Sequence, residues 1–189
     1  MERAERTARF SFLLNAVFSV GYFTLGAILS SWWLIALGVY YLLLSTVRFF
    51  VIITKKKGVF VTKFAGIMLM LLTAPLIGTV ILSVLRDRGH KLHEIIMITM
   101  ALYAFAKITL AAINYVKARK SAKGVVIALR NISFAHAFVS IFALQRSMLV
   151  SFEGMSSSEI RVMNAATGTA VCIIVFLLGL DLIRKKRDE

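Results

Sequence analysis

The sequence predicts an all-α, polytopic membrane protein with six transmembrane helices. Hydrophobic residues make up 59% of the 189 residues, and the mean hydropathy is +0.84. The apolar residues form six runs of about 20 residues, the length at which a helix crosses a ~30 Å hydrocarbon core. Charged residues are 17% of the chain and gather at the ends of these runs. We therefore expect a single membrane domain over residues 1–189, without a separate water-soluble domain.

The first apolar run follows three arginines and could be mistaken for a secretory signal. It is too long for the apolar region of a typical signal peptide and has no clear cleavage site, so we interpret it as a retained helix. Trp32 and Trp33 fall at the start of the second run, and indole rings prefer the headgroup region. The expected spans are Phe10 to Leu29, Trp33 to Ile53, Phe64 to Leu85, Ile95 to Val116, Val125 to Leu149 and Val162 to Ile183.

Lysine and arginine residues are distributed unequally between the two sides of these six spans. One side has four of them, Arg86, Arg88, Lys91 and Arg161. The other has fifteen: Arg3, Arg6, Arg9, Lys55, Lys56, Lys57, Lys63, Lys117, Arg119, Lys120, Lys123, Arg184, Lys185, Lys186 and Arg187. Basic residues favour the cytoplasmic side, so we expect both termini in the cytoplasm and a location in the plasma membrane.

Composition and motifs also exclude several kinds of function. The net charge of +14 is explained by these topology signals and does not predict nucleic-acid binding. Cys172 is the only cysteine, which excludes an intrachain disulfide and a thiolate metal cluster. The sequence has no G-x-S-x-G, H-E-x-x-H or Walker motif and no paired carboxylates. We expect neither an enzyme nor a cofactor.

An internal repeat relates the two halves of the chain. When Ala16 to Ile28 is aligned with Ala101 to Ile113, five of thirteen positions are identical, and Phe18 and Tyr103 are similar. Lys107 aligns with Tyr22. Three helices per half would give the halves opposite orientations, which makes a 3+3 inverted repeat. This is a common plan of secondary transporters.

The order of these features resembles the membrane domain of the cation diffusion facilitator transporters. The segments that carry the resemblance are Asn15 to Phe18 with Gly21 and Gly26, Leu34 to Ala36, Ala101 to Tyr115 followed by Lys117 to Lys123, and Asn164 to Leu182. The resemblance implies a transporter and a homodimer. It predicts a degenerate relative, because the family's cytoplasmic domain has no counterpart here.

The metal ligands of that family are missing as well. The positions where it holds Zn²⁺ correspond to Tyr40, Leu44, Ala135 and Val139, and none of these is a usual zinc ligand. His136 is one residue away from such a position, a rotation of ~100° around the helix. We therefore expect no metal site.

Lys107 is the first candidate for a binding residue. It lies near the centre of its span, and no Asp or Glu occurs at that depth in any span. Intramembrane charges commonly mark functional sites, so Lys107 could hold an anionic ligand, or it could be neutral after desolvation. The alternative is that it lines a small aqueous pocket or hydrogen-bonds Asn and Ser groups. His136, Asn131 and Tyr40 are further candidates for substrate binding, with interhelical hydrogen bonding as the alternative for His136 and Asn131.

Three other charged residues are candidates for ion pairs. Arg48 and Asp181 both lie toward the cytoplasmic ends of their spans and could pair as a gate, or extend to the interface separately. Arg146 lies toward the outside, where Glu94, Glu153 or Glu159 could meet it.

These observations predict a small secondary-transporter-like protein that binds or moves a small, anionic solute rather than zinc. One alternative is a non-transporting membrane component that binds a partner protein or anionic lipid headgroups through its basic cytoplasmic rim. Another is a substrate-binding membrane subunit of a larger import complex.

The topology can be tested by cysteine labelling with a membrane-impermeant reagent. A cysteine at Ser157 should react from outside intact cells, and a cysteine at Lys186 only after the cytoplasmic side is opened. Reversed accessibility would disprove the topology.

Overall fold

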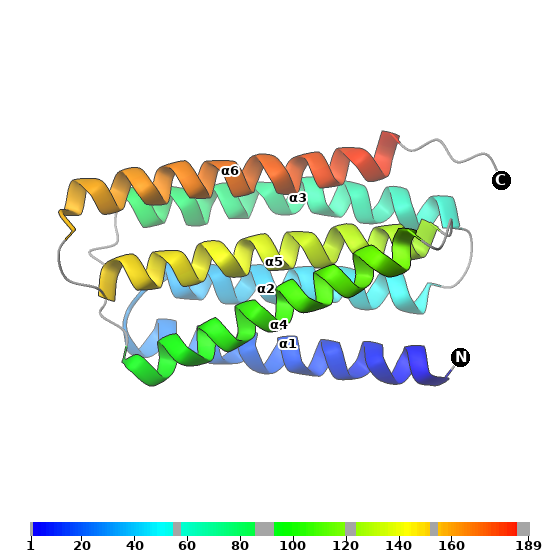
Figure 1. Ribbon diagram of the computed structural model, residues 1–189, viewed down its shortest axis with the longest axis horizontal. Coiled ribbons are helices and arrows are strands. Elements are labelled where there is room, and N and C mark those ends of the chain that lie inside the picture. The colour runs from blue at the N-terminus through cyan, green and yellow to red at the C-terminus, as the bar shows by residue number, and fades with distance from the viewer. Residues whose placement is uncertain (1, 55–57, 86–92, 120–123, 152–154, 185–189) are drawn as a thin grey trace.

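The computed structural model describes residues 2–54, 58–85, 93–119, 124–151 and 155–184. Each expected span is helical, and no strand occurs in these residues (Figure 1). The helices are α1 (Glu2–Ile28), α2 (Trp32–Ile53), α3 (Gly58–Leu85), α4 (Glu94–Arg119), α5 (Gly124–Ser151) and α6 (Ser157–Arg184). The all-α prediction is confirmed.

Length, composition and exposure identify an integral membrane protein. Five helices, α2 to α6, are long and apolar enough to cross a bilayer, while the apolar part of α1, Asn15–Ile28, is shorter. Large apolar side chains face outward on every helix; Val17 on α1 and Leu102 on α4, for example, are 69% and 67% exposed. Apolar surface this extensive requires a hydrocarbon environment.

Several helices extend beyond the predicted spans. α3 begins at Gly58 instead of Phe64, and α6 begins at Ser157 instead of Val162. Each of these helices has 28 residues. At ~1.5 Å per residue such a helix is ~42 Å long, which matches a bilayer with its headgroups included. Sequence hydropathy detects only the part within the hydrocarbon core.

The packing of the helices relates the two halves of the chain. α1 packs along α2 and α4 along α5, and the contact of α2 with α3 has its counterpart in that of α5 with α6. The pairs α2–α5 and α3–α6 each join a helix to its own counterpart. α1 and α4 run in opposite directions (Figure 1). The contact of α3 with α5 is the one without a counterpart, and the rest matches a 3+3 inverted repeat.

Both ends of the chain lie at the same end of the bundle, as an even number of crossings requires (Figure 1). Lys63 at the start of α3 and Arg184 at the end of α6 belong to this end. The sequence adds Lys55 to Lys57, Lys120, Lys123 and Lys185 to Arg187 to the same side, and Arg86, Arg88 and Lys91 to the opposite side; all of these lie outside the described residues.

α1 ends in a motif that reverses the chain tightly into α2. The Ser31 amide donates to the Gly26 carbonyl at 2.8 Å, and the Ser30 amide donates to the Ala27 carbonyl at 3.3 Å. This pair of bonds is a Schellman motif, which needs a left-handed residue just past the helix end. Ser30 takes that position with φ 51°.

Glycines let α3 and α6 approach closely. A Cβ added to Gly66 would lie 2.8 Å from the Gly179 carbonyl oxygen, and one added to Gly179 would lie 2.9 Å from the Gly66 carbonyl oxygen. Both contacts involve backbone atoms, which side-chain rotation cannot move. Small residues that bring backbones together are a common basis of helix association in membranes.

Most hydroxyl groups within the helices are satisfied by their own backbone. Thr24, Thr46 and Thr109 donate to the carbonyl four residues earlier, each at 2.9 Å. Thr79 and Ser83 donate to the carbonyl three residues earlier, each at 2.7 Å. A bilayer offers no water to such groups, so local bonds of this kind make them compatible with lipid or with a dry interface.

We predict that Ser30→Gly stabilises the protein. Glycine adopts left-handed φ values without the ~1–2 kcal/mol that an L-residue incurs there, so the thermal midpoint should rise by about 2–4 °C per kcal/mol gained. The measurement is a thermal melt in detergent. Ser31→Gly is the matched control, because Ser31 has an extended backbone with φ −99° and should gain nothing. Equal shifts for both variants would contradict this account of the turn.

Candidate functional site

Polar side chains from four helices meet near the middle of the bundle. We define the central polar cluster by its residues, which are buried and lie close to the midpoints of their helices: Asn15 of α1, Tyr41 of α2, Tyr103 and Lys107 of α4, and His136 and Ser140 of α5. Lys107 is 4% exposed, and His136 is fully buried. The expected intramembrane lysine therefore faces protein.

The cluster occupies a place where helix backbones stay apart. In the described ranges, no Cα atom of α1 lies within 8 Å of one of α4. Tyr103 and Lys107 are four residues apart and so project from the same face of α4. The Tyr103 ring meets the Phe18 ring of α1 with centroids 4.1 Å apart. Phe18 and Tyr103 are equivalent in the sequence repeat, so the two halves meet here at matching positions.

Lys107 and Asn15 form the polar contact between α1 and α4. The Lys107 amino group donates to Asn15 Oδ1, and the Tyr103 hydroxyl donates to the same oxygen at 3.4 Å. Lys107 Nζ also lies 4.8 Å from the centroid of the Tyr103 ring, a cation–π distance. Both donors use Asn15 Oδ1, and the Asn15 amide nitrogen makes no hydrogen bond within the described residues.

Tyr41 of α2 contacts cluster residues of both α4 and α5. Its hydroxyl donates to Ser140 Oγ at 3.1 Å, and the Ser140 hydroxyl donates to the His136 carbonyl at 2.8 Å. Its ring centroid is 5.4 Å from that of Tyr22, 5.6 Å from that of Tyr103 and 5.9 Å from that of His136. These separations fall in the range of favourable aromatic pairs.

The side chains of the cluster that can carry a charge at neutral pH are basic. The Arg48 guanidinium on α2 acts electrostatically on both Lys107 and His136. The carboxylates of Glu94, Glu159 and Asp181 belong to the end turns of α4 and α6, and no Asp or Glu of the described residues belongs to the cluster. Like charges held together without a carboxylate repel one another, and a bound anion would relieve that repulsion.

Several buried polar atoms on the helices of the cluster have no hydrogen-bond partner within the part of the chain that the structure describes. They are Asn15 Nδ2, the Tyr40 hydroxyl, Ser45 Oγ, Arg48 Nε and the two ring nitrogens of His136. Buried polar groups are nearly always paired, and each one without a partner calls for an explanation such as a ligand or ordered water. These groups can mostly donate, so a ligand rich in acceptor atoms would match them.

The structure brings some predicted site residues together and separates others. Lys107 and His136 belong to the central polar cluster, and Tyr40 is fully buried beside it, with its ring 6.3 Å from that of Tyr41. Asn131 lies elsewhere. Its amide donates to the Leu178 carbonyl at 3.0 Å and to Asp181 at 3.2 Å, so it joins α5 to α6 near the basic end.

The predicted pair of Arg48 with Asp181 is replaced by a different arrangement. Asp181 forms an ion pair with Arg130 at 3.4 Å, and Arg130 also donates to Asn131 at 3.0 Å. Arg48 acts electrostatically on Lys107 of α4 and His136 of α5.

Arg146 has an aromatic neighbour that the sequence analysis did not anticipate. Its guanidinium carbon lies 4.0 Å from the centroid of the Trp33 ring, and Trp33 is 2% exposed while Trp32 is 69% exposed. Only Trp32 is therefore free to reach the headgroup region. Glu153, one of the predicted partners of Arg146, lies outside the described residues.

Sequence reasoning missed four members of the site: Asn15, Tyr41, Tyr103 and Ser140. Two signals could have identified some of them. Asn15 is an amide within the first apolar run, and Tyr103 is four residues before Lys107 and so shares its helix face. Tyr41 and Ser140 had no distinguishing signal, since tyrosine and serine are common in membrane helices.

The four positions that correspond to metal ligands in the cation diffusion facilitators are filled by core packing. Tyr40, Leu44, Ala135 and Val139 are all 0% exposed. Among the described residues, no group of three His, Cys, Asp or Glu side chains is arranged to hold a metal ion. The tyrosine hydroxyl is the only polar atom that these four side chains supply.

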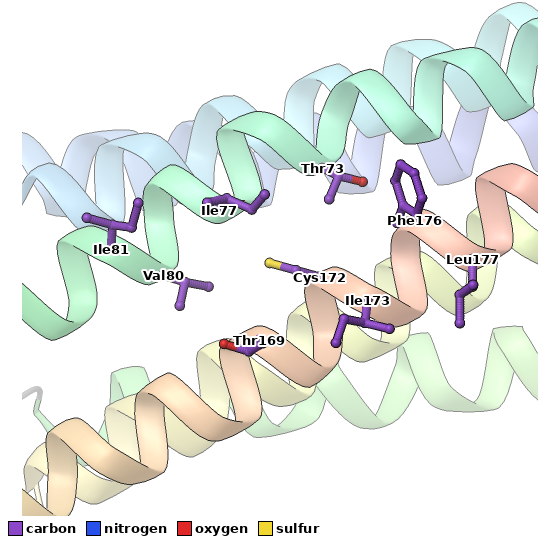
Figure 2. Close-up of a pocket in the computed structure, with 9 residues that line it drawn as sticks. All are labelled: Thr73, Ile77, Val80, Ile81, Thr169, Cys172, Ile173, Phe176 and Leu177. Carbon is purple, nitrogen blue, oxygen red and sulfur yellow. The ribbon is translucent and has the colours of Figure 1, made fainter.

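A second feature is a groove of about 480 Å³ between α3 and α6. Figure 2 shows Cys172 of α6 directed toward α3, with Ile77 and Val80 on the facing side. Thr73 also lines the groove, but its hydroxyl is bonded to the Leu69 carbonyl. The lining has no charged side chain, so it suits lipid chains better than a polar solute.

Comparisons with protein-family models, with curated proteins and with solved structures give no match for this chain. The geometry of the central polar cluster therefore carries the functional argument.

Two tyrosine substitutions should separate structural from ligand-binding roles. Tyr41→Phe removes the hydrogen bond to Ser140 and should lower the free energy of unfolding by about 1 kcal/mol. Tyr40→Phe removes a buried hydroxyl without a partner, so its stability should equal or exceed that of the parent protein. Denaturant or thermal unfolding in detergent measures both. A loss for Tyr40→Phe as large as that for Tyr41→Phe would mean that the Tyr40 hydroxyl has a structural partner.

Proposed function

We propose that this protein is a small secondary-transporter-like membrane protein, not an enzyme, that binds a small anionic solute at the central polar cluster. The observation that carries the proposal is Lys107, a buried basic residue near the middle of α4. Its amino group meets an amide oxygen and an aromatic ring and, among the described residues, no carboxylate. A solute carboxylate or phosphate would supply the missing opposite charge.

The energetics favour such a ligand. A lysine at the centre of a membrane helix disfavours insertion by ~2.5–3.5 kcal/mol on translocon scales. One hydrogen bond to a neutral amide recovers only part of this. Hydrogen bonds to charged groups are worth about 1.5–3 kcal/mol, so an anion that also reaches Asn15 Nδ2 or Arg48 would compensate for the buried charge.

The location of the cluster also supports a transporter. Inverted-repeat transporters place the substrate near the bilayer midplane, at the interface between their halves. Here the cluster lies between α1 and α4 and between α2 and α5, which are the counterpart helices of the two halves. The open spacing of α1 and α4 leaves room for the rearrangement that alternating access requires.

Zinc is not the proposed solute. A relationship to the cation diffusion facilitators stays a prediction, and the family's ligand positions are Tyr40, Leu44, Ala135 and Val139 in this chain. A cationic cluster would repel a divalent metal. We propose that any such relative would have kept the scaffold and changed the charge of its substrate.

The test is Lys107→Met, studied as purified protein in detergent. Thermal shifts should be recorded against a panel of organic carboxylates and phosphates that differ in size and polarity. We expect at least one compound to stabilise the parent protein and none to stabilise the variant. Without ligand, the variant should express and melt like the parent or better, because it removes a buried charge.

Lys63→Met is the matched control, since Lys63 is exposed at the start of α3 and outside the cluster. It should respond to ligands like the parent protein. If Lys107→Met fails to fold, Lys107 is a structural partner of Asn15 and the site proposal is withdrawn. If the compounds stabilise Lys107→Met and Lys63→Met equally, the anion binds outside the central polar cluster.

A second candidate is a membrane component that binds anionic lipid headgroups or a partner protein through its basic end. The described Lys63, Arg130 and Arg184 and most other basic residues of the sequence favour this. Each basic residue near an anionic surface contributes ~1 kcal/mol. Binding to anionic vesicles that persists in Lys107→Met and weakens with salt would support this candidate, as would co-purification of a partner subunit or a second copy.

A further inference from the structure

A second groove, of about 310 Å³, lies between α1 and α4. Phe18, Gly21 and Tyr22 form its α1 side, and Ile96, Thr99 and Met100 form most of its α4 side. It occupies the gap left by the wide spacing of these two helices. The α4 residues that line it all precede Tyr103, so the groove runs from the level of the cluster toward the start of α4.

This groove opens to the hydrocarbon. Val17 and Ile95 at its edges are 69% and 67% exposed, and Gly21 is exposed as well. A Cβ added to Gly21 would meet nothing within 4 Å. A molecule dissolved in the bilayer could therefore enter the groove sideways without passing through water.

The inner wall of the groove is also the outer wall of the central polar cluster. Phe18 stacks on Tyr103, whose hydroxyl reaches Asn15, and Tyr22 contacts Tyr41. One layer of aromatic rings thus separates the apolar groove from the Lys107 amino group. The α3–α6 groove in Figure 2 differs in this respect, because its lining residues include none that contacts this cluster.

We propose that the solute is an amphiphilic anion, a carboxylate on a single alkyl chain, that enters from the bilayer between α1 and α4. Its carboxylate accepts hydrogen bonds from Lys107 and Asn15, and its chain fills the groove. The Phe18–Tyr103 ring pair lies between the groove and the central polar cluster and must move aside to admit the carboxylate. This inference depends on the proposed anion site and specifies the class of its substrate.

Shape and charge support a single-chain carboxylate over other occupants. The groove is at the lower limit of ligand-pocket volumes, ~300–1,000 Å³, so a two-chain lipid would not fit within it. The side chains of its wall are apolar except for the hydroxyls of Tyr22 and Thr99, and the Thr99 hydroxyl donates to the Ile95 carbonyl at 2.8 Å. A fully polar solute would gain nothing from such a wall, and an uncharged amphiphile would leave the cationic cluster uncompensated.

The experiment uses full-length protein in nanodiscs of phosphatidylcholine, with radiolabelled decanoate as the probe in a scintillation-proximity assay. Unlabelled decanoate should displace the probe. Methyl decanoate, which has the chain without the charge, should compete about ten- to a hundredfold more weakly, the loss expected for hydrogen bonds to a charged group. Acetate, which has the charge without the chain, should not compete at millimolar concentration.

Gly21→Leu should block the groove, since its side chain would occupy space that is open in the parent protein. Gly78→Leu is the matched control: a Cβ at Gly78 also meets nothing within 4 Å, and Gly78 lies on α3 outside this groove. Both variants should melt normally. Gly21→Leu should lose at least tenfold in decanoate affinity, while Gly78→Leu should bind like the parent protein.

The outcomes separate this inference from the anion site itself. If acetate competes as well as decanoate and Gly21→Leu binds normally, with both effects lost in Lys107→Met, the anion site stands and lateral entry is disproved. Equal competition by methyl decanoate would show that the groove binds chains without regard to charge, which overturns the proposal. If no carboxylate binds in a Lys107-dependent way, the proposed function fails as well.

Discussion

The burial of Lys107 at the middle of a membrane helix is the constraint around which the central polar cluster is arranged. A bilayer contains no water that could solvate a lysine at mid-depth, so the amino group must find its partners inside the bundle. Asn15 supplies an oxygen across the gap between α1 and α4, and Tyr103 supplies both a ring face and a second donor to that oxygen. The face of α1 that carries Asn15 and the face of α4 that carries Tyr103 and Lys107 therefore lie toward each other.

Side-chain size then sets the spacing of the helices. α3 and α6 approach until the backbones touch at Gly66 and Gly179. α1 and α4 carry Phe18, Tyr103 and Lys107 at the corresponding place and stay apart. The backbones of α3 and α6 are therefore in contact at these glycines, although a groove separates other parts of the two helices, whereas α1 and α4 touch only through side chains. An asymmetry of this kind gives a membrane protein a rigid side and a side that can rearrange, which is what the proposed binding and release require.

Polar groups inside the bundle fall into two chemically different sets. Near the basic end, Arg130, Asn131 and Asp181 neutralise one another and hold α5 to α6, a structural role. In the central cluster, basic side chains lie close together and several buried polar atoms have no partner in the described residues. The first set is complete by itself, whereas the second would be completed by the acceptor-rich ligand that we propose. Function is therefore assigned to the second set.

The sequence by itself determined the number of helices, their approximate ends and the intramembrane lysine, because hydropathy and charge are properties of each segment taken alone. It also indicated the inverted repeat through the alignment of Phe18 with Tyr103, which meet in the structure. Only the tertiary structure decided which polar residues share a site. Helical periodicity shows which residues lie on one face, but the rotation of a helix about its axis depends on the packing of its neighbours. For this reason only the structure shows that Arg48 acts on Lys107 and that Asn131 hydrogen-bonds Asp181. The structure alone also identifies Asn15 and Tyr41 as members of the cluster.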